Sequence, residues 1–261
     1  EALAEEDAVE EGGRKEKASR QVTIDQVRAL DDFLVVGTHR AGLRIVVVNP
    51  ADAMNRSTAN ALLKTLEEPP PSTLFLLTTH QPAQLLPTIR SRCQAVAVDI
   101  PDTGISLKAL AADGLADAER WLALAGGSPG VALELAAAGT GGWLDLLTGQ
   151  LASHQTLDPL AAAAQLDKAV RDAKGKLALR SVIEALQKWV VDISLAANGL
   201  PVRYFVSRRD TIAGLADMIP PVRLVRFYRG LHERRRAAEQ PLNSRLFLEG
   251  MFIDYRALTR P

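Results

Sequence analysis

The sequence predicts an α/β region that is followed by an all-α region. Two runs rich in β-branched and aliphatic residues, 44–48 and 74–79, lie within the first hundred residues, and a stretch with helical periodicity separates them. No strand pattern of comparable strength occurs after Pro101, where apolar residues recur at helical spacing instead. We therefore expect part of a parallel-sheet α/β domain, then a small helical domain, and then a larger helical domain.

The length and composition of the chain support this division. Single domains usually contain about 100–200 residues, and this chain contains 261. We expect residues 1–100 to be the C-terminal portion of the α/β domain, 101–141 to be the small helical domain, and 142–261 to be the larger one. Hydrophobic residues make up 47% of the chain and charged residues 24%, which is typical of packed domains and excludes wholesale disorder.

The first helix and strand are predicted from their apolar residues. Helical spacing within 21–34 is shown by Ile24, Val27, Leu30 and Leu34. The continuous apolar run 44–48 is typical of a parallel strand that is buried on both faces. Either Asn55 or Ser57 is suited to cap the next helix, which should end before the three prolines at 69–71.

A second strand and a third, more peripheral one complete the predicted sheet. The second is the apolar run 74–79, after which Pro82 and Pro87 are suited to begin helical turns. The third is 94–100, where alanines alternate with larger aliphatic residues. The order strand, helix, strand, helix, strand indicates a parallel sheet with helical crossovers.

Helices account for the rest of the prediction. Three short helices are expected at 107–112, 117–125 and 131–138, and the glycine-rich segment 139–142 is typical of a linker. From Trp143 onward the chain is expected to be helical throughout. Its clearest helical periodicities lie at 177–197, 210–219, 221–236 and 242–258.

Several classes of site are excluded by composition. One cysteine permits neither an internal disulfide nor the usual four-ligand thiolate zinc site. Basic and acidic residues number 31 each, so overall charge gives no reason to expect tight autonomous binding to nucleic acid. No apolar run approaches the about 20 residues of a membrane span, and the acidic N-terminus is unlike a signal peptide. We expect a cytoplasmic protein with no metal or cofactor of its own.

The acidic N-terminus also bears on domain organisation. The first residue is Glu1 rather than methionine, and the first eleven residues contain acids but no base. Such a segment is typical of a surface loop rather than of the start of a domain. We expect the chain to lack an N-terminal part.

The end of the first strand carries unexpected residues. Active P-loop ATPases end this strand in acids that hold Mg²⁺ and polarise the attacking water. Here Val48 is followed by Asn49 and Pro50, neither of which supplies a carboxylate. The phosphate-binding pattern G-x-x-x-x-G-K-[ST] does not occur in the chain. The sequence therefore predicts an ATPase-type fold without ATPase chemistry.

Two strings point to a known family. Residues 60–69, NALLKTLEEP, and residues 88–93, TIRSRC, resemble the clamp-loader branch of the AAA+ ATPases, found in bacterial DNA polymerase III and its archaeal and eukaryotic relatives. Within that branch the chain most resembles the delta-prime subunits, on the strength of Asn49-Pro50 and of 240–249, QPLNSRLFLE. The resemblance implies an AAA+ α/β domain, a helical lid and a helical collar through which subunits join in a ring.

The resemblance also implies roles for individual residues. Arg92 corresponds to an arginine finger that acts in trans on ATP held by the next subunit, with Ser91 and Cys93 as supporting residues. Gly130 stands where active relatives carry a phosphate-sensing arginine, and His80 lies near a polar sensor position. Without the family strings, Arg92 would be interpreted as a helix cap or the partner of a nearby acid. Cys93 alone would be interpreted as a small buried residue.

We expect a non-hydrolysing clamp-loader subunit that assembles with gamma/tau and delta subunits in a hetero-oligomeric ring. Through that complex it would act on the sliding clamp and primer–template DNA, as part of a DNA-directed DNA polymerase (a nucleotidyltransferase holoenzyme) in bacterial DNA replication. One alternative is an active gamma/tau-like ATPase whose phosphate loop lies upstream. Another is a stand-alone DNA-binding protein. The cluster Arg234–Arg236 is interpreted as a solvated helix face, with a DNA or partner contact as the alternative.

An apolar stripe near the C-terminus has two interpretations. It is a surface that joins partner subunits, or it belongs to the core of its own domain. Its members are Leu242, Leu246, Phe247, Met251 and Phe252.

Overall fold

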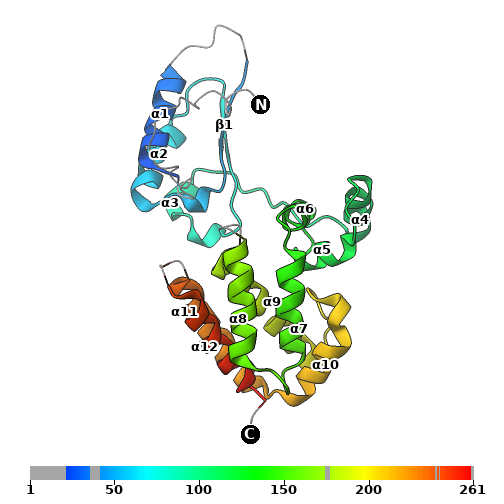
Figure 1. The fold of residues 1–261 in the computed structure, drawn as a ribbon. Helices are drawn as coiled ribbons and strands as arrows, with labels where there is room; N and C mark the ends of the chain where they lie inside the picture. The colour runs from blue at the N-terminus through cyan, green and yellow to red at the C-terminus, as the bar shows by residue number, and fades with distance from the viewer. Residues whose placement is uncertain (1–21, 36–41, 174–176, 239, 241, 260–261) are drawn as a thin grey trace. The chain divides into compact units, whose positions relative to one another are not determined.

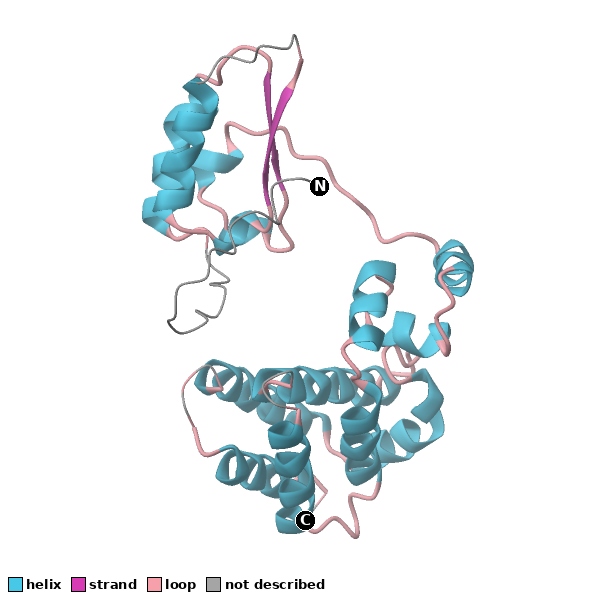
Figure 2. Ribbon diagram, turned by 45° about the horizontal axis from the view of Figure 1, so that its top comes forward, coloured by secondary structure: helices cyan, strands magenta, loops and turns pink. Residues whose placement is uncertain are grey.

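A computed structural model describes residues 22–35, 42–173, 177–238, 240 and 242–259 (Figure 1). The chain divides into two compact units, Glu1–Val98 and Asp99–Pro261. The described residues are largely helical, and they contain one parallel sheet of two strands (Figure 2). No described helix is both long and apolar enough to cross a membrane. The predicted acidic surface loop at the N-terminus lies outside the described residues.

The first unit consists of two parallel strands and the helices around them. Strand β1 (Arg44–Val48) pairs with β2 (Thr73–Leu77) in register from Arg44 opposite Thr73 to Val48 opposite Leu77. Helix α2 (Arg56–Glu67) connects the two strands, as expected for a parallel pair. The other elements are α1 (Ile24–Val35), η1 (Ala51–Ala53), η2 (Pro82–Gln84) and α3 (Pro87–Arg90).

Local sequence explains where α2 begins and ends. The Asn55 side-chain oxygen accepts a hydrogen bond from the Thr58 backbone N–H at 2.9 Å, so Asn55, one of the two predicted caps, is the N-cap. The helix ends at Glu67, immediately before the proline run at 69–71. Its buried residue Leu62 packs with α1 and with the inward-facing residues Val46 and Val48 of β1.

Only one face of the sheet is covered by the described residues. Helices α1 and α2 lie on the same side of it (Figure 2). On the other side, four strand residues are between 42% and 60% exposed: Ile45, Val47, Leu74 and Leu76. The prediction that β1 is buried on both faces is therefore wrong for the described part of the chain, because no described element packs on the second face.

The predicted third strand at 94–100 is also wrong. These residues form no strand, and the side chains of Val96 and Val98 are 77% and 92% exposed. An alternating pattern makes a strand only where a partner strand offers free backbone groups. Both strands of the described sheet pair with each other, and neither pairs with this segment.

Helices are the only regular secondary structure among the described residues of the second unit. Three short helices come first: α4 (Thr103–Ala112), α5 (Ala118–Leu124) and α6 (Pro129–Ala137). They are followed by α7 (Gly141–Ala152), α8 (Pro159–Asp172), α9 (Leu179–Ala197), η3 (Val206–Arg208), α10 (Arg209–Met218), α11 (Pro221–Ala237) and α12 (Ser244–Arg256). The predicted linker at 139–142 is wrong, since α7 already begins at Gly141. Gly139, at φ 67°, ends the preceding turn, and the buried Thr140 is the N-cap.

Long helices pack around Trp189 of α9. Its indole N–H donates to the hydroxyl of Tyr255 on α12 at 3.0 Å, and that hydroxyl donates to the backbone carbonyl of Leu151 at 3.0 Å. Both aromatic side chains are at most 1% exposed, so this chain of bonds satisfies two buried polar groups. Burial raises the pKa of Tyr255, which keeps its hydroxyl protonated.

A buried carboxylate holds the segment that follows α9. Asp192 is fully buried and accepts hydrogen bonds from the backbone N–H groups of Arg203, Tyr204 and Phe205, at 2.7–3.1 Å. Burial raises the pKa of Asp192, and the three N–H donors oppose that shift. The arrangement places Phe205 edge-on against Trp189, with ring centroids 5.3 Å apart.

Short and long helices share one core. Leu124 of α5 belongs to the same buried cluster as Trp189, although α4 to α6 also have a small cluster of their own. The Lys188 ammonium of α9 donates to the Leu124 carbonyl at 2.8 Å, and Arg120 forms an ion pair with Asp145 of α7 at 2.5 Å. Burial lowers the pKa of Lys188.

Candidate functional site

Arg92 lies in the turn that follows α3, where its side chain is 33% exposed. The guanidinium forms an ion pair with Glu67, the last residue of α2. It also donates a hydrogen bond to the Thr88 backbone carbonyl at 2.9 Å. Arg92 therefore pairs with an acid from the other family string, 60–69, and it remains accessible from solvent.

The one-turn helix α3 fixes this geometry. Pro87 occupies its first turn, where a missing backbone N–H costs no intrahelical bond. Ile89, which is 1% exposed, anchors the turn in the unit. The Ser91 hydroxyl donates to the same Thr88 carbonyl at 3.1 Å, so Ser91 and Arg92 share one acceptor.

Cys93 is half-buried and carries a free thiol. Burial raises the pKa of this thiol, so it is protonated at neutral pH and poorly suited to nucleophilic attack. Its position after Arg92 and its partial burial are those of a small packing residue.

Polar side chains meet at the carboxyl ends of β1 and β2. The Thr78 hydroxyl donates to the Asn49 side-chain oxygen at 2.5 Å, and the Thr79 hydroxyl donates to the Asp52 carboxylate at 2.6 Å. Asp52 was not predicted as a site residue, although it is the first acid after Asn49 and Pro50, which follow β1. Its carboxylate already has a hydroxyl partner. Within the described ranges, no group of three or more metal-ligating side chains is arranged to hold a metal ion.

His80 and Gly130 lie on the surface. His80 follows these threonines and is exposed. Gly130 is the second residue of α6, in the other compact unit. A Cβ atom built on Gly130 would meet no heavy atom within 4 Å, so a larger side chain would fit at this exposed position.

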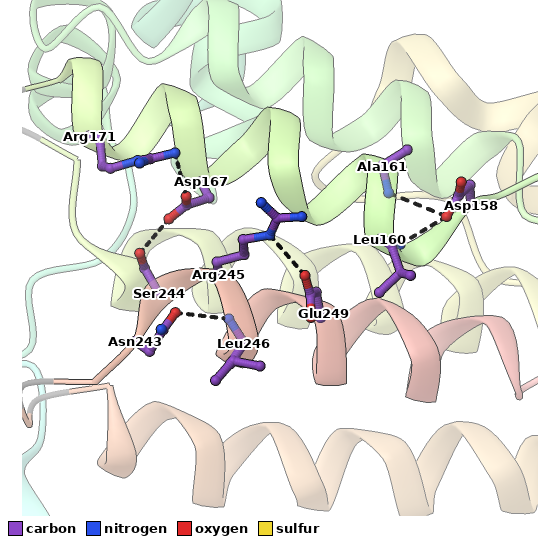
Figure 3. A network of polar contacts seen from close by, with 10 residues as sticks. All are labelled: Asp158, Leu160, Ala161, Asp167, Arg171, Asn243, Ser244, Arg245, Leu246 and Glu249. Atoms are coloured by element: carbon purple, nitrogen blue, oxygen red, sulfur yellow. Dashed lines mark hydrogen bonds and ion pairs between the residues drawn. The ribbon is translucent and has the colours of Figure 1, made fainter.

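The C-terminal string, 240–249, builds the start of α12. Asn243 is the N-cap of this helix, and its side-chain oxygen accepts a hydrogen bond from the Leu246 N–H at 3.2 Å (Figure 3). The Ser244 hydroxyl donates to Asp167 of α8, and the Asp167 carboxylate also pairs with Arg171 at 2.8 Å. The hydrogen bond between Ser244 and Asp167 links the start of α12 to α8.

The C-terminal apolar stripe divides between core and surface. Met251 and Phe252 are fully buried, and Phe247 is half-buried. Leu242 and Leu246 are 43% and 65% exposed, and Leu246 points away from α8 (Figure 3). The interpretation as core therefore holds for the buried part of the stripe, and the exposed part remains available to a partner.

Two arginines of the 234–236 cluster have acidic partners. Arg234 pairs with Asp254 of α12 and lies over the Phe247 ring, and Arg235 pairs with Glu184 of α9 at 3.0 Å. Arg236 is exposed. The cluster is thus partly a link between helices rather than a uniformly solvated face.

Sequence comparison supplies the family context. Residues 5–101 match the family described as DNA polymerase III, delta subunit. The DNA polymerase III subunit delta' of Pseudomonas aeruginosa is 48% identical over 118 residues, which are 44% of this chain and 36% of the relative. The subunit delta' of Escherichia coli is 37% identical over 123 residues, or 46% of this chain and 37% of the relative. The chain thus matches little more than a third of these relatives' length.

One solved structure is that of a DNA polymerase III gamma subunit-related protein from Thermotoga maritima. The alignment covers 94% of this chain and 82% of the Thermotoga maritima chain. Its TM-score is 0.45 and its sequence identity 21%, values too low to define a shared fold. The match to the family covers both family strings and the degenerate strand end. The sequence comparisons confirm the prediction that this chain resembles the delta-prime subunit of bacterial DNA polymerase III.

Proposed function

We propose that this chain is a non-hydrolysing subunit of a bacterial DNA polymerase III clamp loader, acting in DNA replication. It presents Arg92 to ATP that is held by a neighbouring subunit. The observation that carries the proposal is the placement of Arg92 on an exposed turn, within a string that resembles the clamp-loader family. A planar, permanently charged guanidinium is suited to stabilise charge on phosphoryl oxygens.

The ion pair with Glu67 does not oppose this role. Partly exposed pairs are worth about 0–1 kcal/mol, and the Arg92 and Glu67 side chains are 33% and 49% exposed. An arginine finger contributes about 10³–10⁵ in rate, which corresponds to about 4–7 kcal/mol at the transition state. Release from Glu67 therefore costs little compared with what the finger contributes.

The chain's own strand ends support a role without hydrolysis. Mg²⁺ in such sites is held by carboxylates and phosphate oxygens. Asn49 accepts a hydrogen bond from Thr78, Pro50 has no polar side chain, and the nearby Asp52 is engaged by Thr79. Gly130 has no side chain that could place a positive charge near a phosphate. In this proposal the ATP sites of the assembly belong to other subunits.

Three modules follow from the same proposal. Residues 1–100 are part of a larger AAA+ α/β domain, whose remainder covers the sheet face that bears Ile45 and Leu76. The exposure of that face supports this assignment. Residues 101–141 are the lid and residues 142–261 are the collar, which joins gamma/tau and delta subunits. The sliding clamp and primer–template DNA are reached through the assembled ring.

Reconstitution with gamma/tau and delta subunits tests the proposal. The chain is expected to co-elute with them in size-exclusion chromatography. Leu246→Asp combined with Ile253→Asp, at positions of α12 that are 65% and 48% exposed, should weaken this association about tenfold or more. Burial of such side chains at an interface contributes about 1.5–3 kcal/mol each.

Leu200→Asp is a single-site control for an exposed leucine outside α12, because Leu200 is 53% exposed but lies in the segment after α9. It should leave the association unchanged. Failure of the unmodified chain to join these subunits would exclude the clamp-loader assignment. Normal association of the α12 variant would exclude only this face as the contact.

A further inference from the structure

Helix α11 carries an exposed basic stripe, defined by Arg226, Arg229 and Arg236. Among the residues that the structure describes, none of the three side chains has a hydrogen-bond or ion-pair partner. The neighbouring Arg234 and Arg235 differ, since both pair with acids of other helices. The stripe therefore contains the exposed, unpaired member of the 234–236 cluster, Arg236, and excludes its two paired members.

Helical spacing places the stripe on one face of α11. Arg229 lies three residues after Arg226, and Arg236 lies seven residues further on, so the three point to the same side. At 1.5 Å per residue, the stripe extends over about 15 Å. A shallow hollow on the same face is lined only by α11 residues between Pro221 and Glu233.

The charge of this face is not fully balanced locally. Glu233 is the only acid on α11, which contains six arginines, and it offsets at most one charge of the stripe. The acids of other helices that contact this end of α11, Glu184 and Asp254, are already paired with Arg235 and Arg234. Like charges at helical spacing repel one another, so the remaining positive charge would attract an anion that lies along the stripe.

The distribution of apolar residues indicates which anion fits. Protein–protein interfaces usually have an apolar centre and a polar rim. The exposed Val222 and Val225 line the same hollow as Arg226 and Arg229, but they lie at one end of the stripe. Between Arg229 and Arg236, α11 has no large exposed apolar side chain. A row of guanidinium groups whose apolar neighbours lie at one end, and not at its centre, fits the regularly spaced phosphates of a nucleic-acid strand better.

We propose that the Arg226, Arg229 and Arg236 stripe binds the phosphate backbone of nucleic acid without reading its sequence. The proposal does not rest on the clamp-loader assignment, since the stripe belongs to the isolated chain. Because the net charge of the chain is zero, binding is expected to be weak and salt-dependent, with a dissociation constant of about 10⁻⁴–10⁻⁶ M.

Fluorescence anisotropy with a short labelled DNA duplex tests the proposal on the full 261-residue chain. The variant Arg226→Gln/Arg229→Gln/Arg236→Gln should weaken binding about tenfold or more at low salt. The slope of log affinity against log salt should fall in magnitude by about 2–3, because each lost phosphate contact removes about 0.9.

The matched control is Arg234→Gln/Arg235→Gln/Arg245→Gln, which removes the same formal charge from arginines that already pair with acids. It should change affinity much less, and circular dichroism should show both variants folded. Equal losses in the two variants, or no loss in either, would overturn the proposal. Equally effective competition by a polyglutamate peptide would also overturn it, in favour of an acidic protein partner.

Discussion

Replacing Arg92 by alanine is expected to reduce the clamp-stimulated ATPase activity of the assembled loader while leaving assembly intact. The side chain lies on an exposed turn and its ion pair with Glu67 contributes little to stability. The affected neighbouring site should lose about 10³–10⁵ in rate. Total activity should fall only in part, because this subunit completes one site. Steady-state phosphate release from the reconstituted complex measures the loss.

Two substitutions distinguish a finger from general damage to the turn. Arg92→Lys should restore little of the lost ATPase activity. A lysine ammonium keeps the positive charge but lacks the planar arrangement of N–H donors of a guanidinium. Arg90→Ala removes an exposed arginine two residues away and should have a much smaller effect. Equal losses at positions 90 and 92 would indicate that the turn itself is disturbed. Full activity of Arg92→Ala would make this subunit a passive scaffold.

Replacing Asp192 by alanine is expected to lower the free energy of unfolding by about 3 kcal/mol. The substitution leaves the backbone N–H groups of Arg203, Tyr204 and Phe205 without their acceptor. Each buried donor that loses its partner costs about 1–3 kcal/mol, and the costs are not fully additive. Urea denaturation at neutral pH measures the change.

Asp192→Asn is the matched control, since it keeps the shape but retains only one acceptor oxygen. Its loss should be smaller than that of alanine. Burial raises the pKa of Asp192, so the folded state binds its proton more tightly than the unfolded state does. The contribution of this group to stability therefore falls as pH rises through the raised pKa, and both variants should lack that trend. A stability loss below about 1 kcal/mol in the alanine variant would contradict this account of the segment.

Helices with a strong apolar periodicity were predictable from sequence. The predicted helices 177–197 and 221–236 correspond to α9 (Leu179–Ala197) and α11 (Pro221–Ala237). Their boundaries depend on local signals, such as the proline that begins α11. A stripe of apolar residues specifies a helix largely by itself, because its backbone hydrogen bonds are internal.

The predicted strand 94–100 was wrong for the opposite reason. A strand's backbone groups need a partner from elsewhere in the chain, so alternation alone does not make one. Burial of a strand face also depends on residues far away in the sequence. One face of β1 and β2, which includes Val47, is exposed because no described residues pack on it.

The candidate site was predictable in its residue types and not in its contacts. Arg92 was identified by its string, but its pairing with Glu67 depends on how α2 and α3 pack. The contact between Asp52 and Thr79 likewise joins the ends of two separate segments. Neither contact could be predicted from the spacing of residues along the chain.

Photoaffinity labelling of the assembled loader tests the central claim most directly. An ATP analogue with an azidoanilide group on its γ-phosphate would be cross-linked, and the labelled peptides of this chain identified by mass spectrometry. The account predicts labelling at residues 88–93 in the complex and none in the isolated chain. Labelling of the isolated chain near Asn49, or no labelling of residues 88–93 in the complex, would contradict it.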